Sequence, residues 1–375
     1  MGAHDKNSPA VDRRHLFARF WLTASRFWSG RSGRLAWGLT VILILIVLLQ
    51  LLVQYLLNYW NRYFFDALER RDATALWTQA ELFVPLAAAS VVLGAASVWG
   101  RMTTQRKWRE CVTRQVIEYW LANDKFRQLD PLAADSANPE YRISEDVRVA
   151  TDPPVDLVLA FFASVLTAIV FLSVLWSVGG SITFDAFGRS WTIPGYLVIS
   201  VVIYSTLFSS AMLIVGRQLT GVIERKNQSE AEFRAAADRL LQAKVHGEEG
   251  NGTRRMLWKA VHVALDRWRS LLWQLVQTTL VSHGNSILAP VIGLLLCVPK
   301  FLSGTMSLGE LTQSAAAFVI VQSAFNWLVD NYGRIADWRS SVNRVATLLL
   351  ALDALDAADQ LGEIDGSQPR RQVPR

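Results

Sequence analysis

The sequence predicts an all-α membrane protein with six transmembrane helices and long cytosolic extensions. Three observations support this fold class. The chain of 375 residues is 51% hydrophobic and contains 15 tryptophans. Six apolar segments have about the 20 residues that a helix needs to cross a bilayer. Two long polar segments between them keep apolar residues at helical spacing, which is typical of helices that continue out of the membrane.

Composition and charge exclude several other classes of function. The net charge is +6, but the basic residues are spread along the chain, so nucleic-acid binding is not indicated. Cys111 and Cys297 fall in separate predicted helices and suggest neither a disulfide nor a metal pair. No nucleophile, base and orienting group are recognisable, and the few histidines lack metal-ligand spacing. We therefore expect neither an enzyme nor a metal centre.

The N-terminal region is expected to contain a disordered start and a surface helix. Residues 1–14 are polar and show no periodicity. From His15 to Ser29 the apolar residues recur at helical spacing, while Arg19 and Arg26 fall on the other face. This pattern predicts an amphipathic elbow helix on the membrane surface.

The predicted spans are separated by connections of very different length. The second and fourth spans continue into polar helical stalks, Arg101–Asp130 and Gly216–Ser270, and the other connections are short. Basic residues concentrate in the N-terminal region, the stalks and the tail, so these parts and both termini are assigned to the cytosol. The spans are Leu35–Leu57, Leu82–Trp99, Val155–Val178, Tyr196–Val215, Leu271–Val298 and Leu311–Val329.

Prolines and glycines predict where some of these elements begin and end. Pro153 precedes the third span, at a position where a helix N-terminus tolerates proline. Gly179-Gly180 and Pro194-Gly195 bracket a short loop after this span. A last amphipathic helix follows the sixth span, so residues 15–352 form one domain, and residues 353–375 are expected to be a mostly disordered tail.

The segment from Asn58 to Asp72 carries the most specific pattern in the chain. The aromatic residues Trp60, Tyr63, Phe64 and Phe65 lie beside charges at helical spacing, Arg62 with Asp66 and Asp66 with Arg70. The pattern indicates the outer end of the first helix as it leaves the bilayer through an aromatic belt. A purely structural ladder and a functional outer mouth both remain open. The residues of this outer-mouth motif are Asn58, Trp60, Asn61, Arg62 and Asp66.

Four short stretches within this organisation carry a resemblance to a known family. They resemble the transmembrane domain of exporter-type ABC transporters, in the branch of the SbmA/BacA peptide transporters and the related fused permease-ATPases. The resemblance covers roughly residues 15–352. The stretches are Leu57–Asp72, Asn138–Asp146, Glu230–Arg234, and Gly309–Gln313 together with Ile335–Arg339.

The resemblance implies a transporter in the inner membrane. It implies a homodimer of the domain-swapped type, with twelve spans around one cavity, and uptake of peptides or peptide-like compounds driven by the proton gradient. The sequence has no Gly-x-x-x-x-Gly-Lys-[Ser/Thr] phosphate loop, so we expect no ATP site, no other cofactor and no nucleotide-binding domain. A permease subunit that uses a separate ATPase, and a membrane scaffold that transports nothing, are the alternatives.

A proton-driven carrier needs an ionisable group that meets alternating sides of the membrane. Glu81 and Glu310 lie toward the predicted outer side and are the first candidates for proton coupling. His283 is a third, because histidine changes its charge near neutral pH. Each also has a structural explanation, as an interfacial charge or a hydrogen-bonded residue.

Two further groups of polar residues are candidates for a functional role. Amide side chains in the last two spans either line a hydrated cavity or hold helices together. A charged region after the first stalk either docks an ATPase or caps the stalk. The amide candidates are Gln277, Asn285, Gln313, Gln322 and Asn326, and the cytosolic coupling region is Asn138, Arg142, Glu145 and Asp146.

Overall fold

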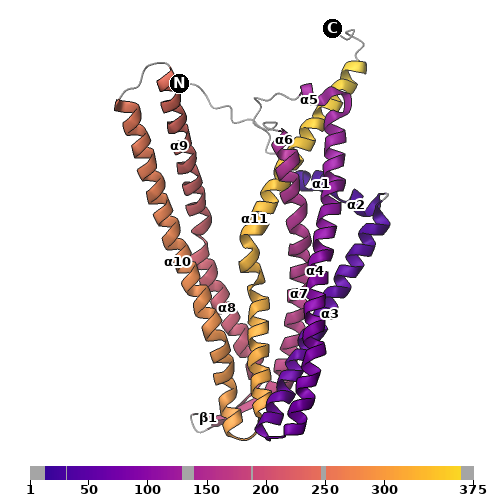
Figure 1. The fold of residues 1–375 in the computed structure, drawn as a ribbon, viewed down its shortest axis with the longest axis vertical. Coiled ribbons are helices and arrows are strands. Elements are labelled where there is room, and N and C mark those ends of the chain that lie inside the picture. The colour runs from indigo at the N-terminus through magenta and orange to yellow at the C-terminus, as the bar shows by residue number, and fades with distance from the viewer. Residues whose placement is uncertain (1–12, 31, 129–138, 187–188, 246–250, 365–375) are drawn as a thin grey trace. The chain divides into compact units, whose positions relative to one another are not determined.

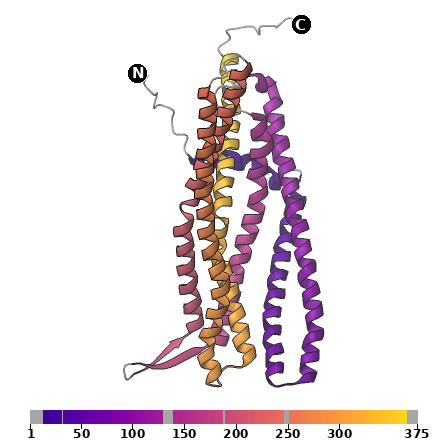
Figure 2. The same ribbon diagram turned by 60° about the vertical axis from the view of Figure 1, so that its left-hand side comes forward.

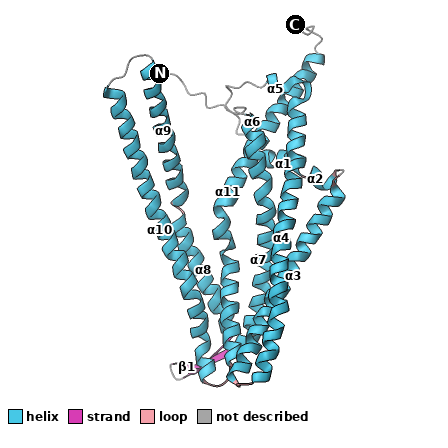
Figure 3. Cartoon of the chain, viewed as in Figure 1, coloured by secondary structure: helices cyan, strands magenta, loops and turns pink. Residues whose placement is uncertain are grey.

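The computed structural model is helical almost throughout, and it describes residues 13–30, 32–128, 139–186, 189–245 and 251–364 (Figures 1 and 3). A 3-10 turn at Ala122–Asp124 and a π-helical turn at Arg142–Asp146 link the shorter helices. The helices are α1 Arg13–Ala24, α2 Arg26–Ser29, α3 Gly33–Glu69, α4 Ala73–Leu121, α5 Lys125–Gln128, α6 Pro139–Tyr141, α7 Val147–Gly179, α8 Tyr196–Gly216, α9 Leu219–Val245, α10 Asn251–Leu302 and α11 Leu308–Ile364.

Five helical segments in the described part of the chain are long and apolar enough to cross a membrane. They contain the first five predicted spans, so the chain is a multi-pass membrane protein. The sixth predicted span, Leu311–Val329, is helical within α11 but is not among them. Its three amides, Gln313, Gln322 and Asn326, lower its hydropathy. The sixth crossing stays a prediction.

The chain divides into two compact units. Unit 1 comprises the described residues within Met1–Val53, Ala87–Ala163 and Asn331–Arg375, and unit 2 comprises Gln54–Leu86 and Ser164–Asp330. Helices α3, α4, α7 and α11 contribute to both units. In unit 2, α9 and α10 lie side by side in both views, and the predicted stalk Gly216–Ser270 covers α9 and the first part of α10 (Figures 1 and 2).

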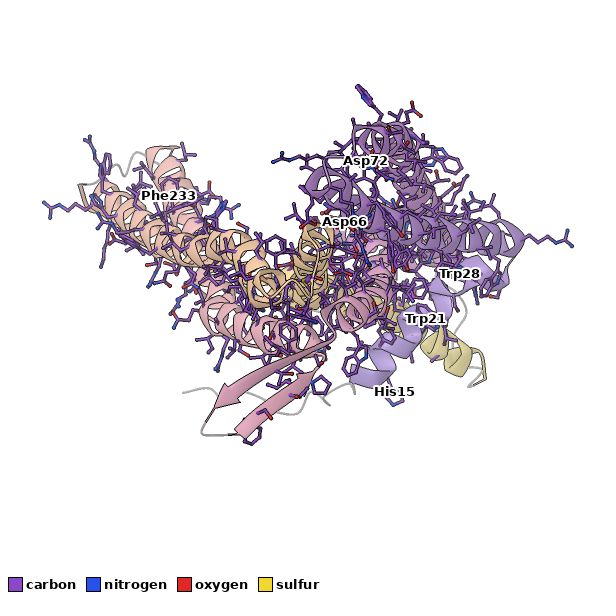
Figure 4. All side chains as sticks on the ribbon, turned by 90° about the horizontal axis from the view of Figure 1, so that it is seen from below. His15, Trp21, Trp28, Asp66, Asp72 and Phe233 are labelled. Carbon is purple, nitrogen blue, oxygen red and sulfur yellow. The ribbon has the colours of Figure 1, made fainter. Side chains whose placement is uncertain are left out.

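The predicted elbow helix forms the edge of the core of unit 1, and it is interrupted at Ser25 between α1 and α2. Phe20 and Phe27 are buried, whereas Phe17 and Trp21 are 45% and 47% exposed. Figure 4 shows where Trp21 lies on α1. One part of the apolar face of the elbow helix therefore packs in the protein core, and the other part lies on the protein surface. Its core partners are Trp108, Val112 and Val116 of α4, Val147 and Ala150 of α7, and Val342, Val345, Ala346, Leu348 and Leu349 of α11.

Helix α7 begins before the position that its prolines predict. Pro153 was expected at a helix N-terminus, but Pro153 and Pro154 both lie inside α7. A proline removes one backbone N–H and leaves the carbonyl four residues earlier without its helical partner. The carbonyl of Ala150, freed by Pro154, instead accepts a hydrogen bond from Trp338 Nε1 at 3.1 Å. Packing on α11 therefore allows the helix to continue through the prolines.

The connection between α7 and α8 is a β-hairpin, and the loop predicted here is wrong. Strands β1 Ser181–Ala186 and β2 Arg189–Pro194 pair antiparallel along their whole length (Figure 2). Both strands alternate aromatic or β-branched residues with polar or small ones, a strand signal that the flanking glycines obscured. The residue between β2 and α8, Gly195, has φ +59°, and a Cβ there would lie 2.4 Å from the ring of Trp176. Both the backbone conformation and the lack of space therefore require glycine at this position.

Helix α11 is one continuous helix from Leu308 to Ile364. It contains the predicted sixth span and the predicted amphipathic helix that follows. It also extends past Leu352, where a mostly disordered tail was expected to begin. The predicted disordered start was residues 1–14, but Arg13 and Arg14 belong to α1. Residues 1–12 and the end of the tail, residues 365–375, lie outside the described residues.

Candidate functional site

The outer-mouth motif of α3 meets the N-terminus of α11 in unit 2, and four contacts join the two helices. We call these contacts the α3–α11 ladder. They bring together two of the stretches that carry the family resemblance. The contacts are Leu308 N to Glu69 Oε2 at 3.0 Å, Gly309 N to Asp66 Oδ1 at 2.9 Å, Arg62 Nη2 to Glu310 Oε1 at 2.8 Å, and Asn58 Nδ2 to the Gln313 carbonyl at 3.2 Å.

The ladder uses the free backbone donors at the start of α11. The first N–H groups of a helix have no partner inside the helix and carry a partial positive charge, which favours carboxylates there. Ser307 and Glu310 satisfy two more donors reciprocally: Ser307 Oγ accepts from Glu310 N at 3.2 Å, and Glu310 Oε2 accepts from Ser307 N at 3.1 Å. This is a capping box, so Glu310 both caps α11 and pairs with Arg62 of α3.

Gly309 allows the two helices to approach closely. A Cβ at this position would lie 2.1 Å from the carbonyl oxygen of Arg62 and 2.4 Å from Asp66 Oδ1. Figure 4 shows Asp66 close to the ribbon of α11. Any side chain at residue 309 would therefore push α11 away from the backbone of α3.

The charge pairing within the outer-mouth motif differs in part from the prediction. Arg62 Nε lies 3.8 Å from Asp66 Oδ2, as expected. No pair between Asp66 and Arg70 forms among the described residues, because α3 ends at Glu69 and Asp66 instead accepts the N–H of Gly309. The helical spacing of Arg62 and Asp66 predicted their ion pair. It could not predict that Asp66 also binds the backbone of Gly309, because that contact joins two distant parts of the sequence.

Trp60 fastens the same motif to α4. Its Nε1 donates to the Gln79 carbonyl at 2.8 Å, and its ring lies 4.8 Å from the ring of Phe83. The aromatic belt predicted from sequence therefore also packs helix against helix within unit 2. Asn61, the remaining residue of the motif, is partly buried beside these contacts.

Of the three proton-coupling candidates, only Glu310 belongs to the ladder. Its side chain is 26% exposed and is held by Arg62. Glu81 is exposed and makes no hydrogen bond or ion pair with the described residues. His283 is also exposed on α10, where its backbone carbonyl accepts from Ser286 Oγ. The structure does not bring the three side chains into one site.

The five amide candidates do not line one surface. Asn285 Oδ1 accepts from Tyr204 at 2.9 Å, and Asn326 Oδ1 lies 3.4 Å from Ser209 Oγ, so both join α8 to a neighbouring helix. Gln277 is exposed. Gln313 and Gln322 are 0% and 2% exposed. Because each residue of a helix turns by about 100°, residues nine positions apart lie on opposite sides of α11.

Asp146 in the cytosolic coupling region is buried in an ion pair within unit 1. It is 1% exposed, and Arg344 of α11 donates to it from Nε at 2.9 Å and from Nη2 at 2.7 Å. Glu145 pairs locally with Arg148 at 2.6 Å. Of the two hypotheses for this region, these contacts favour a cap on the stalk rather than a surface that docks an ATPase, because the Asp146 carboxylate does not face a free surface. Arg142 donates to the Arg344 carbonyl at 3.4 Å, and Asn138 lies outside the described residues.

A second charged site in unit 1 was not predicted. The Tyr119 hydroxyl lies 2.6 Å from Asp353 Oδ1 and 2.7 Å from Asp356 Oδ2. Arg19 pairs with Asp353 at 2.5 Å, and Lys125, 1% exposed, pairs with Asp356 at 2.7 Å. We call these five residues the charge cluster. They come from α1, α4, α5 and α11, and the two aspartates follow residue 352, where a tail was expected.

The charge cluster keeps its acids ionised. Burial raises the pKa of Asp353, but hydrogen bonds from Arg19 and Tyr119 outweigh it, so this pKa lies below its ordinary value. Hydrogen bonds from Lys125 and Tyr119 lower the pKa of Asp356. Burial and the hydrogen bonds to both carboxylates raise the pKa of Tyr119. Near neutral pH the cluster therefore contains two carboxylates and a neutral hydroxyl.

Residues 27–245 match the family described as ABC transporter transmembrane region 2. This match covers more than half of the chain, and the chain belongs to that family. The family resemblance is thus confirmed for an ABC-type transmembrane region, and the SbmA/BacA branch stays a prediction. The match identifies a membrane-spanning region of the kind that ABC transporters contain.

The curated relatives are longer than this chain. It is 27% identical over 350 residues to the inner membrane ABC transporter ATP-binding protein YddA of Escherichia coli, covering 89% of this chain and 61% of the relative. An uncharacterized ABC transporter ATP-binding protein of Haemophilus influenzae is 22% identical over 345 residues, with 90% and 57% covered. The ABC transporter D family member 2, chloroplastic, of Arabidopsis thaliana is 19% identical over 363 residues, with 95% and 49% covered. The chain spans about half to three-fifths of their length.

Proposed function

We propose that this chain works as a homodimer in the inner membrane and takes up peptides or peptide-like compounds, driven by the proton gradient. Family membership supports membrane transport, and the motif stretches support the SbmA/BacA branch. In this proposal Leu311–Val329 is the sixth span, so two chains supply twelve, and both termini are cytosolic. The YddA protein, which is named as an inner membrane protein, supports the location.

The contact between Glu310 and Arg62 is the observation that carries proton coupling. Glu310 takes part in one interaction that needs its negative charge, the ion pair with Arg62 of α3. Protonation would remove this ion pair, and it would therefore loosen α11 from α3. A group whose protonation shifts a two-state contact in this way is what a proton-driven carrier requires.

The first test is peptide uptake into proteoliposomes with an imposed pH gradient and no ATP. The proposal predicts uptake that rises with the gradient and disappears when a protonophore dissipates it. Uptake that is indifferent to the gradient would overturn proton coupling. Absence of any substrate binding by the purified dimer would overturn transport itself and favour a scaffold.

The alternative is the membrane part of a transporter that is powered by an ATPase. Two of the relatives described above are named ABC transporter ATP-binding proteins, and they extend beyond the region that this chain matches. Copurification of a nucleotide-binding partner, together with uptake that requires ATP, would favour this alternative. A surface test should use Glu145→Lys, because reversing the buried Asp146 would disturb folding and would not report on docking.

A further inference from the structure

The α3–α11 ladder contains buried polar atoms that the ladder itself does not satisfy. Four residues contribute such atoms, and Asn58 and Gln313 are only 4% and 0% exposed. A buried polar atom without a partner is costly, more so in a membrane protein, and ordered water often satisfies it. The atoms without a hydrogen-bond partner in the described protein are Asn58 Oδ1, Asn61 Oδ1, Arg62 Nε, and Nε2 and Oε1 of Gln313.

These atoms come from two helix faces that touch. Asn58, Asn61 and Arg62 are three and four positions apart, so they share one face of α3. Asn58 bonds to the backbone of Gln313, and Arg62 bonds to Glu310, one turn earlier on α11. The unsatisfied atoms therefore belong to the same contact between α3 and α11.

The mixture of donors and acceptors identifies the ligand. A metal cation could bind the amide oxygens but would leave Arg62 Nε and Gln313 Nε2 unpaired and close to its charge. An anion would leave the oxygens of Asn58 and Asn61 unpaired. Water both donates and accepts, and one molecule makes about three hydrogen bonds. Turning an amide end for end would exchange a donor for an acceptor but would leave both kinds present.

The distance between Arg62 and Asp66 points to the same ligand. Arg62 Nε lies 3.8 Å from Asp66 Oδ2, too far for a direct hydrogen bond. A water molecule commonly bridges polar atoms at such a separation. We propose that the α3–α11 ladder holds an internal water site, with about two or three molecules bound by Asn58, Asn61, Arg62 and Gln313.

The water site stands on these contacts alone and does not depend on proton-driven transport. Where the proposed function holds, the site also deepens it. Water beside Arg62 stabilises the charged form of the ladder, and it gives protons a path to Glu310 that does not require the two helices to separate. Gln313 is then a positioning residue for this water.

The experiment compares Gln313→Met with the same change at the exposed Gln277. Methionine keeps the length and flexibility of glutamine but removes both polar atoms. With water bound, Gln313→Met leaves that water short of partners, and the Tm in lipid nanodiscs is expected to fall by about 2 °C or more relative to Gln277→Met. If the contact between α3 and α11 contains no water, Gln313→Met removes two polar atoms that have no hydrogen-bond partner, and the Tm should rise. A rise in Tm would therefore overturn the water site.

A direct observation keeps the inference falsifiable if Gln313→Met fails to fold. A cryo-EM map of the wild-type dimer at a resolution that shows solvent should contain peaks about 2.7 to 3.2 Å from Asn58 Oδ1 and Gln313. A map that shows ordered solvent elsewhere and none at this contact would refute the site. Uptake assays do not affect either result, so failure of the proposed function remains distinguishable.

Discussion

The α3–α11 ladder of unit 2 and the charge cluster of unit 1 both fasten helix α11 with charged side chains, but they do so differently. In the ladder, carboxylates of α3 bind backbone N–H groups of the first turn of α11. In the charge cluster, α11 supplies the carboxylates, and side chains of three other helices surround them. The ladder therefore depends on close backbone approach, whereas the cluster depends on several side chains that share two acids.

This difference predicts which contacts respond to a single change. Neutralising Glu310 removes its ion pair with Arg62, while the neutral side chain can still accept the capping hydrogen bond from Ser307 N. In the cluster, Arg19 pairs with Asp353 and Lys125 pairs with Asp356, and the Tyr119 hydroxyl can donate its single proton to either acid, so an acid that loses one partner still has another within reach. We therefore expect the ladder to be the contact that a proton can switch, and the side-chain contacts of unit 1 to be fixed.

The largest effect should come from the ion pair that holds the buried carboxylate of Asp146 in unit 1. Arg344→Ala leaves Asp146, whose side chain is 2% exposed, without its cation. Breaking a fully buried pair by removing one partner costs about 3–5 kcal/mol, and because Arg344 is itself 46% exposed, we expect a loss at the lower end of this range. Chemical denaturation of the whole protein in detergent, followed by tryptophan fluorescence, would measure the loss.

The matched control is Arg339→Ala, an exposed arginine on the same helix. Its removal should change the unfolding free energy by less than about 0.5 kcal/mol. Equal effects of the two changes would contradict the structural role of Asp146, and would return this region to the docking hypothesis.

The next effect tests close approach in the ladder. Gly309→Ala places a methyl group 2.1 Å from the carbonyl of Arg62, so α11 must move or α3 must bend. Such overpacking costs about 1–3 kcal/mol. Gly333→Ala on the same helix meets no atom within 4 Å, and it should stabilise the protein by about 0.5–1 kcal/mol through helix propensity. Thermal unfolding of both variants measures the two effects. A Gly309→Ala variant with the same Tm as the wild type would argue against the close approach of α3 and α11.

A smaller effect is expected at the charge cluster. Tyr119→Phe removes one hydroxyl that lies within hydrogen-bond distance of both carboxylates. Arg19 and Lys125 remain, so the loss at neutral pH should be about 0.5–1.5 kcal/mol. Unfolding in urea at pH 7 measures this loss.

The same variant should change the response to acid. The pKa values of Asp353 and Asp356 lie below their ordinary values in the folded protein. Their contribution to stability is therefore present above an unfolded-state pKa of about 4 and is lost as the pH falls through the folded pKa. Tyr119→Phe should reduce this acid-dependent loss, measured as the decrease in Tm between pH 6 and pH 3. An unchanged decrease would show that Tyr119 does not hold the two acids.

The sequence predicted those parts of the fold that local patterns determine. The first five spans follow from length and hydropathy alone, and the stalks follow from helical spacing in polar segments. The start of α7 could not be predicted, because the carbonyl freed by Pro154 is satisfied by Trp338, far along the chain. The hairpin of β1 and β2 carried a visible alternation that the flanking glycines and proline outweighed.

The two stretches that form the candidate site could each be predicted from the sequence, but their contact could not. The sequence singles out the outer-mouth motif and the stretch from Gly309 to Gln313, but nothing in either stretch indicates that they meet. Their contacts join residues about 240 to 255 positions apart. The charge cluster gave even less signal, because it combines single residues from four helices. Asp353 and Asp356, three positions apart, were its only local pattern.

In the proposed function, Glu310 of the α3–α11 ladder is the residue that couples protons to transport. The most direct test is the initial rate of peptide uptake by proteoliposomes under an imposed pH gradient, for the wild type, Glu310→Gln and the exposed Glu81→Gln. We predict that Glu310→Gln remains a folded dimer but no longer responds to the gradient, while Glu81→Gln responds as the wild type does. A Glu310→Gln variant whose uptake still rises with the gradient would contradict the account.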